Sequence, residues 1–316
     1  MLFISADQLR KKGIVGMNYR NIALIGRQNP RQLFPIVDNK LNTKKAAIAM
    51  NIPVPTLLAV VERQRQLRDL ESLLKPFTSF VIKPARGSGG KGILVINHKD
   101  YDYFVKNNGS KLQLKDIRRH INNIISGLYS LGGKPDVAMI EAVIEYDPVF
   151  NDYTYEGVPD LRIIVYRGFP VMAMLRCSTH ASDGRANLHQ GAIGVGIDIK
   201  TGKSLFAVQH SKPVSHHPDT GKAFSHLDIP FWNDILTLTA GCFEMTGLGY
   251  LGCDIVIDKQ RGPMILELNA RPGLAIQLAN GMGLKQALAR VDGLSAEQLE
   301  MTAEQRVGWL MATEDL

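Results

Sequence analysis

Residues 79–96, SFVIKPARGSGGKGILVI, contain the spacing G-x-G-x-x-G at Gly87, Gly89 and Gly92. The segments on both sides of this loop are rich in β-branched and aromatic residues and are predicted to be strands. A dinucleotide-binding loop is followed by a helix whose N-terminus receives the pyrophosphate, so that class is excluded. A Gly-rich loop between two strands is typical of a flap that folds over phosphates. An ordinary Gly-rich surface hairpin is the alternative that these residues alone leave open.

Two other phosphate-binding loops are excluded by the positions of single residues. The pattern G-x-x-x-x-G-K-[ST] would need glycine at Ala85 and serine or threonine at Gly92. A protein kinase carries its lysine on the strand after the flap, whereas Lys83 precedes it, and the chain contains neither H-R-D nor D-F-G. The segment 85–92 is therefore a flap of another class or a plain hairpin, and we call it the flap below.

The composition is that of a soluble globular protein. The chain has 316 residues, of which 45% are hydrophobic and 21% charged. It contains no apolar run long enough to cross a bilayer, and its first residues, MLFISADQLRKKG, have the wrong order for a secretory signal. The three cysteines are widely spaced, and their spacing does not match that of a metal site. We expect them to be reduced thiols. We therefore expect a cytoplasmic protein that does not engage a membrane.

The formal net charge of +7 raises the question of nucleic-acid binding. The basic residues are spread along the chain, and their runs fall in predicted helices, where such runs are usually solvated faces. No nucleic-acid motif is present, so the sequence gives this function little support. A modest excess of lysine and arginine also suits an enzyme that handles a polyphosphate and an acidic substrate.

The order of predicted elements indicates an α+β fold, with helices and antiparallel hairpins in separate subdomains. A strand and turn are expected near 18–29. Helices are expected at 42–50, 62–74, 98–107, 115–131 and 231–246, and as short pieces at the end of the chain. Strands are expected at 56–61, 79–83, 93–96, 137–144, 160–168, 169–178, 192–199 and 202–209, and in a last hairpin at 253–269.

The last predicted hairpin concentrates oxygen donors. Glu267 and Asn269 lie two residues apart and so share one face of a strand. If the turn spans 259–262, Asp254 on the preceding strand pairs directly opposite Glu267. Mg²⁺ prefers a few such oxygens together with water and nucleotide phosphates. The alternative is a surface hairpin whose polar face happens to be acidic.

Taken in order along the chain, these features resemble the ATP-grasp superfamily. The features are Lys40 in VDNKLNTKK, Lys83 with its flap, Glu141 in MIEAVI, and Asp160 and Arg162 in DLRIIV. They end with RANLHQGA at 185–192 and LELNARPGL at 266–274. The last two segments are similar to motifs of the RimK-like branch of α-L-glutamate ligases. The resemblance covers about residues 36–290, and the stretch 194–222 also resembles sugar-transfer-associated ATP-grasp proteins.

The resemblance implies an ATP-grasp fold with two α+β lobes that enclose ATP, and it implies roles for individual residues. Arg176 could instead form a salt bridge between strands, and His189 could simply satisfy loop carbonyls. The implied nucleotide-binding residues are Lys40, Lys83, Gly87, Ser88, Gly89, Gly90, Lys91, Gly92 and Glu141. The implied Mg²⁺ ligands are Asp254, Glu267 and Asn269, and the residues that would stabilise the transferring group are Arg162, Arg176, Arg185 and Asn187.

The domain organisation expected from the resemblance has one departure, a truncated N-terminal domain. The expected parts are a short segment 1–37, an ATP-grasp domain 38–290 and a helical tail 291–316. Within the ATP-grasp domain, the flap-bearing lobe is expected at about 55–137 and the metal lobe at about 138–290. Either the acceptor is then bound differently, or a second copy or a partner protein completes the acceptor site. His216 and His217 fit either a ligand role or a loop feature beside the turn P-D-T-G.

The function implied is ATP-dependent joining of a carboxylate to an amine through an acyl-phosphate. The substrates would be a small molecule or peptide with a carboxylate and an amine donor, for which glutamate is a candidate. The cofactors would be ATP and one or two Mg²⁺, with Mn²⁺ as an alternative. A phosphotransferase on the same fold and a nucleotide-binding protein without ligase activity remain open. A basic nucleic-acid binder would instead show steeply salt-dependent affinity for DNA or RNA.

Overall fold

The computed structural model describes residues 5–87 and 89–313 and divides the chain into two compact units. Unit 1 comprises residues up to 38, 46–53 and 146 onward, and unit 2 comprises 39–45 and 54–145. The helix α4 (Lys40–Ala49) begins in unit 2 and ends in unit 1. Residues 138–145, which the sequence assigned to the metal lobe, group with unit 2. In the described residues, no helix is long and apolar enough to cross a membrane.

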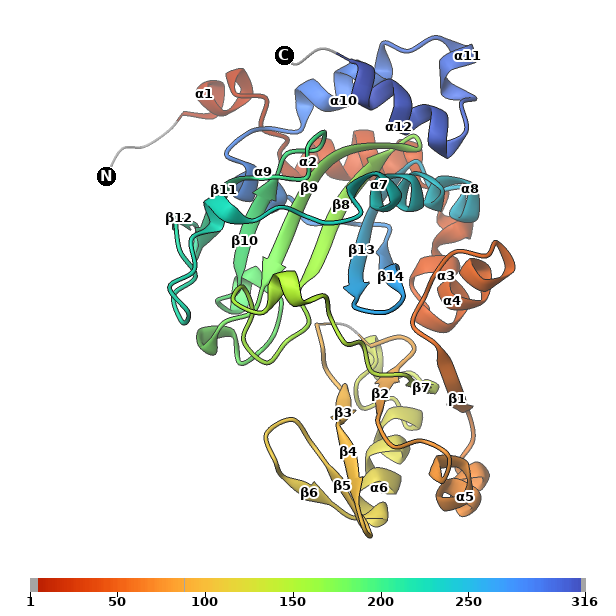
Figure 1. Cartoon of the computed structure of the whole chain (residues 1–316). Helices are drawn as coiled ribbons and strands as arrows, with labels where there is room; N and C mark the ends of the chain where they lie inside the picture. The colour runs from red at the N-terminus through yellow and green to blue at the C-terminus, as the bar shows by residue number, and fades with distance from the viewer. Residues whose placement is uncertain (1–4, 88, 314–316) are drawn as a thin grey trace. The chain divides into compact units, whose positions relative to one another are not determined.

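Unit 1 is built on an antiparallel sheet of seven strands (Figure 1). The central strands are buried on both faces, which explains their nearly continuous apolar sequences. In sheet order the strands are β12 (Lys212–Pro213), β11 (Ser204–Gln209), β10 (Ile193–Ile197), β9 (Phe169–Cys177), β8 (Asp160–Tyr166), β13 (Tyr250–Asp258) and β14 (Gly262–Asn269).

Helices cover this sheet and supply the rest of the unit 1 core. A cluster of buried residues joins β8 and β9 to the helices α9 and α10, and α7 and α12 also contact β9. The helices of unit 1 are α1 (Ala6–Lys11), α2 (Met17–Tyr19), α3 (Phe34–Val37), α7 (Trp232–Ala240), α8 (Cys242–Thr246), α9 (Ile276–Asn280), α10 (Lys285–Asp292), α11 (Ala296–Leu299) and α12 (Ala303–Ala312). The three cysteines are buried and free.

Two glycines of β10 allow α9 to lie directly on the sheet. A Cβ at Gly196 would stand 2.4 Å from the carbonyl oxygen of Ala279, and one at Gly194 would stand 3.2 Å from the Ala279 Cβ. Gly194 pairs with Arg176 across the antiparallel ladder, so the two residues share a face. Helix α9 therefore covers the face of the sheet that carries Arg176.

The segment near 18–29 is helical, so the prediction of a strand and turn there is wrong. After α2, the chain continues as a π-helix over Arg20–Gly26. Leu24 is buried in the cluster that contains Tyr250, and the side chain of Asn29 bonds to the backbone N–H and C=O of Tyr250. The apolar residues of this segment carry no clear period, so packing against the sheet decides its conformation.

Unit 2 contains a four-stranded antiparallel sheet and a three-stranded one (Figure 1). Helix α6 (Leu114–Ile125) buries Ile117, Ile121, Ile124 and Ile125, one stripe of an amphipathic helix, in the core of this unit. The larger sheet has the order β1 (Leu57–Val61), β7 (Ala138–Glu141), β2 (Phe80–Pro84), β3 (Leu94–Ile96). The smaller has the order β4 (His98–Asp100), β5 (Tyr103–Val105), β6 (Lys111–Leu112), and a 3-10 helix Gln64–Asp69 leads into α5 (Leu70–Leu74).

The helix predicted at 98–107 is also wrong, because this segment forms the hairpin of β4 and β5. Tyr101, Phe104 and Val105 have helical spacing, but Tyr101 is almost fully exposed and adopts a positive φ of 50° in the turn. Phe104 packs edge-on against Phe80, with ring centroids 5.9 Å apart. Pairing of β5 with β6 outweighs the local helical pattern.

Candidate active site

A row of charged and amide side chains crosses four neighbouring strands of the unit 1 sheet on one face. Asp254 of β13 pairs directly with Glu267 of β14 on one side and with Arg162 of β8 on the other. The register predicted from the sequence for Asp254 and Glu267 is therefore confirmed. Asp160 of β8 pairs in turn with Arg176 of β9. We call these five residues and Asn269 the polar row.

Asp254 is the centre of the row and is held by two arginines. The Arg162 side chain donates from Nε to Oδ1 at 2.8 Å and from Nη2 to Oδ2 at 2.6 Å. Arg176 donates from Nη2 to the same Oδ2 at 2.7 Å. Burial would raise the pKa of Asp254, but Arg162 and Arg176 outweigh it and hold the pKa below its usual range. Asp254 is therefore a carboxylate at neutral pH.

Arg176 joins Asp254 to Asp160 and forms the salt bridge between strands that the sequence left as an alternative. It makes a bidentate pair with Asp160, in which Nη2 lies 2.8 Å from Oδ2. Burial raises the pKa of the Asp160 carboxyl to about 6, although Arg176 partly offsets this effect. The two aspartates raise the pKa of Arg176, against the effect of its own burial. This part of the row is a fixed framework of alternating charge.

Glu267 and Asn269 end the row with side chains that are only half-buried. The Asn269 Oδ1 accepts a hydrogen bond from the Arg271 N–H at 2.8 Å and has a second lone pair left. A carboxylate offers about four lone-pair sites, of which Asp254 uses three on the arginines. Within residues 5–87 and 89–313, no three His, Cys, Asp or Glu side chains gather as a metal site. The oxygen donors present thus fit a magnesium site that relies on Glu267, Asn269 and one remaining site of Asp254.

The loop RANLHQGA lies just before β10, and its Leu188 packs on Gly194, which pairs with Arg176 of the polar row. Arg185 is exposed and lies 3.5 Å from Asp183, and Asn187 caps a short 3-10 turn by accepting the His189 N–H at 3.0 Å. In the described part of the chain, Arg185 and Asn187 make no hydrogen bond or ion pair with the row. Their predicted catalytic role stays a prediction.

The second histidine of the pair at 216–217 is part of the loop structure. His217 is buried, with Nε2 3.1 Å from the carbonyl oxygen of Ser178. The N–H of Asp219 donates to its Nδ1 at 3.3 Å. Both ring nitrogens of His217 therefore already have partners, whereas His216 is exposed.

In unit 2, two lysines surround one buried glutamate. Lys83 on β2 lies 2.6 Å from Oε2 of Glu141 on β7, and Lys44 on α4 lies 2.9 Å from Oε1. All three side chains are nearly inaccessible, and Lys44 also donates to the carbonyl oxygen of Pro55. Each oxygen of the buried Glu141 carboxylate is thus held by one lysine, which fixes the position of the Lys83 ammonium.

Lys44 was not predicted from the sequence. It lies four residues after Lys40 on α4, so the two lysines share a helix face. The Lys40 ammonium donates to the carbonyl oxygen of Gly87 at 2.7 Å, which places it at the start of the flap. The spacing of Lys40 and Lys44 was visible in the sequence, but nothing in the sequence identified Glu141 as the partner of Lys44.

The glycines of the flap differ in whether their surroundings leave room for a side chain. Gly87 and Gly92 leave no room for a side chain, since a Cβ would stand 2.3 Å from Pro84 or 2.7 Å from the Tyr129 ring. Gly89 and Gly90 have positive φ angles of 62° and 74° and open space around them. Their backbone can therefore approach a ligand closely. Lys91 is exposed at the tip, and Ser88 lies outside the described residues.

Both ends of the flap are tied to other parts of unit 2. The Arg86 N–H donates to the carboxylate of Asp136, which also accepts the Ser130 hydroxyl at 2.7 Å. At the other end, the Nε2 of His120 lies 3.0 Å from the carbonyl oxygen of Gly92. These contacts hold the two ends of the flap in place. Asp136 and His120 come from distant segments, and no sequence pattern linked them to the flap.

We expect Gly92→Ala to destabilise unit 2 more than Gly89→Ala. Both changes place a side chain at a positive φ, but only the one at 92 also collides with Tyr129. Overpacking of this kind costs about 1–3 kcal/mol beyond the backbone strain. Chemical denaturation followed by circular dichroism measures the difference. Equal destabilisation by the two variants would mean that the Tyr129 contact does not constrain the flap.

We expect Lys83→Met to weaken ATP binding about 10- to 100-fold, the range for loss of a charge-assisted hydrogen bond. Glu141 keeps Lys44 as its partner in this variant, so unit 2 should remain folded. Titration calorimetry with a non-hydrolysable ATP analogue measures the change, with Lys75→Met, at an exposed lysine of the same unit, as the control. Unchanged ATP affinity in Lys83→Met would show that Lys83 does not contact the nucleotide.

Comparison with known families identifies the class of this protein. Residues 19–293 match the family described as sugar-transfer associated ATP-grasp. The chain therefore belongs to that ATP-grasp family, and the resemblance deduced from its motifs is confirmed. A comparison with curated proteins gives no match.

Solved structures with a similar fold include several ATP-grasp proteins. The ATP-grasp ligase PsnB, complexed with a minimal precursor, has 12% identity and a TM-score of 0.45, with 84% of this chain and 62% of that chain covered. A D-alanyl-alanine synthetase A from Vibrio cholerae has 11% identity and a TM-score of 0.47, covering 88% and 66%. A RimK domain ATP-grasp protein from Sphaerobacter thermophilus has 14% identity and a TM-score of 0.45, covering 83% and 70%. The chain thus spans about three fifths of the length of PsnB.

Proposed function

We propose that this chain is an ATP-dependent carboxylate–amine ligase. The observation that carries the proposal is the polar row, in which Arg162 and Arg176 flank Asp254 beside Glu267 and Asn269 on one sheet face. A ligase of this kind must bring a carboxylate against the γ-phosphate of ATP, and two anions repel each other. Fixed arginines and a metal site neutralise that repulsion without reorganisation during the reaction.

The nucleotide would be bound by residues of unit 2. Lys83 and Lys44 are held by the buried Glu141 carboxylate, and Lys40 lies at the start of the flap. The backbone N–H groups near Gly89 and Gly90 would contact the β- and γ-phosphates, as in other anion-binding loops. Glu267, Asn269 and Asp254 would hold one or two Mg²⁺, which supply positive charge at the phosphates. Mn²⁺ would fit the same oxygen donors.

The proposed reaction has two steps. A carboxylate oxygen of the first substrate attacks the γ-phosphorus, an O–P bond forms, and ADP leaves. The amine nitrogen of the second substrate then attacks the acyl carbon, a C–N bond forms, and phosphate leaves as the amine loses a proton. Positioning of the reactants contributes on the order of 7–11 kcal/mol in reactions of this kind. Closure of the flap would exclude water from the acyl-phosphate.

The substrates belong to the proposal as classes only. The carboxylate would be carried by a small molecule or a peptide, and the amine by glutamate or another amino acid. Arg185 and Asn187 border an exposed loop of unit 1 and would contact the group that is transferred. A second copy of the chain or a partner protein would complete the acceptor site.

Hydroxylamine trapping tests the proposal without knowledge of the amine. The protein is incubated with Mg-ATP, a panel of carboxylates and hydroxylamine, and hydroxamates are sought by mass spectrometry. Formation of a hydroxamate that depends on both ATP and protein is the expected result, since hydroxylamine displaces phosphate from an acyl-phosphate. A product that is heavier by a phosphoryl group and resists hydroxylamine would show a phosphotransferase instead.

A further inference from the structure

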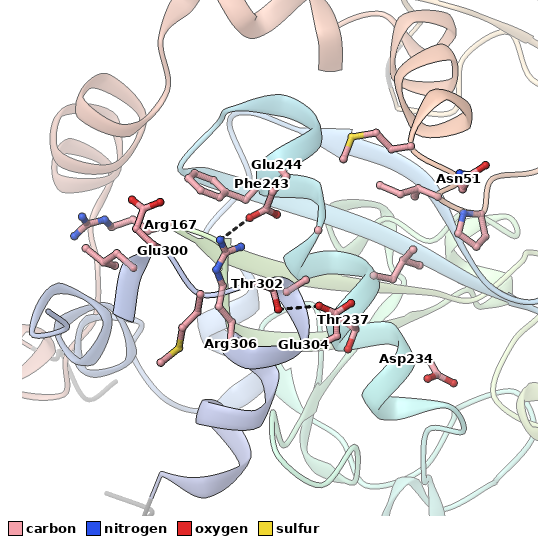
Figure 2. Close-up of a pocket in the computed structure, with 18 of the residues that line it drawn as sticks. Asn51, Arg167, Asp234, Thr237, Phe243, Glu244, Glu300, Thr302, Glu304 and Arg306 are labelled. Carbon is pink, nitrogen blue, oxygen red and sulfur yellow. Dashed lines mark hydrogen bonds and ion pairs between the residues drawn. The ribbon is translucent and has the colours of Figure 1, made fainter. Parts of the chain in front are cut away.

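Unit 1 contains a cavity of about 1190 Å³ that is lined by none of the polar row residues. Figure 2 shows it between α7, α8, the segment that includes α12, and the chain at residues 50–53. A volume of this size accommodates a small organic molecule. Lining side chains such as Leu238, Phe243 and Leu299 are partly accessible, so a ligand can reach them without unfolding of the helices.

The walls of the cavity are largely apolar. Leu238 and Phe243 come from α7 and α8, Leu299 and Met301 precede α12, and Ile52 completes the lining from the other side. All five side chains are partly accessible rather than fully buried. An apolar chain or ring that binds here would exchange its contact with water for contact with these side chains. Burial of this kind is favourable by about 25 cal/mol per Å² of apolar surface.

The charged groups of the lining are mostly acidic. The lining contains four carboxylates and two guanidinium groups. The carboxylates belong to Asp234, Glu244, Glu300 and Glu304, and the guanidinium groups to Arg167 and Arg306. The chain as a whole has a net charge of +7, so this local excess of acid opposes the general composition. In the described part of the chain, Asp234 and Glu300 form no ion pair.

The two arginines do not neutralise those free carboxylates. Arg306 is almost fully buried, forms a 2.5 Å ion pair with Glu244, and lies over the rings of Phe169 and Phe243. Arg167 lies 3.8 Å from Asp292, which is outside the cavity. The cavity therefore presents apolar walls and unpaired negative charge to any occupant.

We propose that this cavity binds a small amphipathic amine, a molecule with a protonated amino group and an apolar chain or ring. The apolar part packs against Leu238, Phe243 and Leu299, and the ammonium group pairs with Asp234 or Glu300. The site is separate from the proposed ligase machinery, and its occupation does not depend on ATP.

One backbone hydrogen bond joins the cavity lining to the strand that carries Glu267 and Asn269. Ile52 and Pro53 line the cavity, and the carbonyl oxygen of Pro53 accepts the N–H of Ile265 at 2.9 Å. Ile265 lies on β14, two residues before Glu267. A ligand that contacts Ile52 and Pro53 thus acts on the edge of the strand that carries the proposed magnesium ligands.

The test uses three probes with the same chain, n-hexylamine, n-hexanol and hexanoate. Ligand-observed NMR and titration calorimetry on the full chain without ATP measure their binding. We expect hexylamine to bind most tightly, hexanol more weakly and hexanoate weakest. Equal binding of hexylamine and hexanol, or stronger binding of hexanoate, would overturn the assignment of a cationic ligand, and absence of hexylamine binding would overturn the site.

Variants place the binding in the cavity. Asp234→Asn with Glu300→Gln should weaken hexylamine binding by about two- to fivefold per carboxylate, the range for a solvent-accessible ion pair, and leave hexanol binding unchanged. Leu238→Trp should narrow the cavity where the apolar part of the probes packs and weaken binding of both hexylamine and hexanol. Glu297→Gln removes an exposed carboxylate of α11 outside the lining and serves as the matched control. Equal effects of Glu297→Gln and Glu300→Gln would show binding through general charge and contradict the proposal.

Discussion

Replacement of Glu267 by glutamine is expected to lower ATP-dependent ADP release by at least about 100-fold, the loss typical of removing a principal electrostatic contact in a phosphoryl-transfer site. Glu267 pairs with Asp254 across the hairpin, beside the arginines that hold Asp254. Glutamine keeps the size of the side chain and removes the negative charge that a magnesium ion needs. A coupled assay for ADP at saturating Mg-ATP measures the change.

The same variant should stay folded. Glu267 is only half-buried, and substitutions at such positions usually change the free energy of unfolding by less than about 1 kcal/mol. Glu297→Gln, the same chemical change on exposed α11, is the control and should retain full ADP release. Full ADP release by Glu267→Gln, with a normal melting temperature, would show that Glu267 is not a required metal ligand.

Asp254→Asn is expected to impair both stability and activity. Asp254 accepts hydrogen bonds from two arginines that are largely buried, and removal of its charge leaves Arg162 without a carboxylate. Removing one partner of a buried ion pair costs about 3–5 kcal/mol, and the lower end applies here because Arg176 keeps Asp160. Denaturant unfolding of the variant measures the loss.

An exposed ion pair gives the contrast for this measurement. Asp100 and Lys111 lie 2.5 Å apart, but both side chains are accessible to solvent, so Asp100→Asn should hardly change stability. If Asp254→Asn were as stable as Asp100→Asn, the arginine framework would not depend on Asp254. Asp254 would then be free to serve mainly as a metal ligand.

The sequence was sufficient to predict those parts of the site that depend on strand periodicity. The period of two residues placed Glu267 and Asn269 on one face, and the short turn fixed Asp254 opposite Glu267, as the structure confirms. The order of Lys83, the flap and the last hairpin was specific enough to indicate the ATP-grasp superfamily. The first of these inferences rests on local strand geometry, and the second on the resemblance of the motifs to a known family.

The sequence was not sufficient where distant segments decide the outcome. The hairpin at 98–105 was read as a helix because only its pairing with β6 distinguishes the two conformations. Likewise, the residues near 18–29 are helical because they pack against Tyr250, more than 200 positions away in the chain. Lys44 shows the same limit in the site, since its role follows from Glu141 on another element.

The most direct test of the proposed ligase is the ratio of free phosphate to ADP, measured with Mg-ATP across a panel of amino acids and acidic peptides. Intact-mass analysis of the same mixtures identifies the product. The account predicts equal amounts of ADP and phosphate, together with a product in which a carboxylate and an amine have joined with loss of water. ADP without free phosphate, and a product heavier by a phosphoryl group, would contradict it.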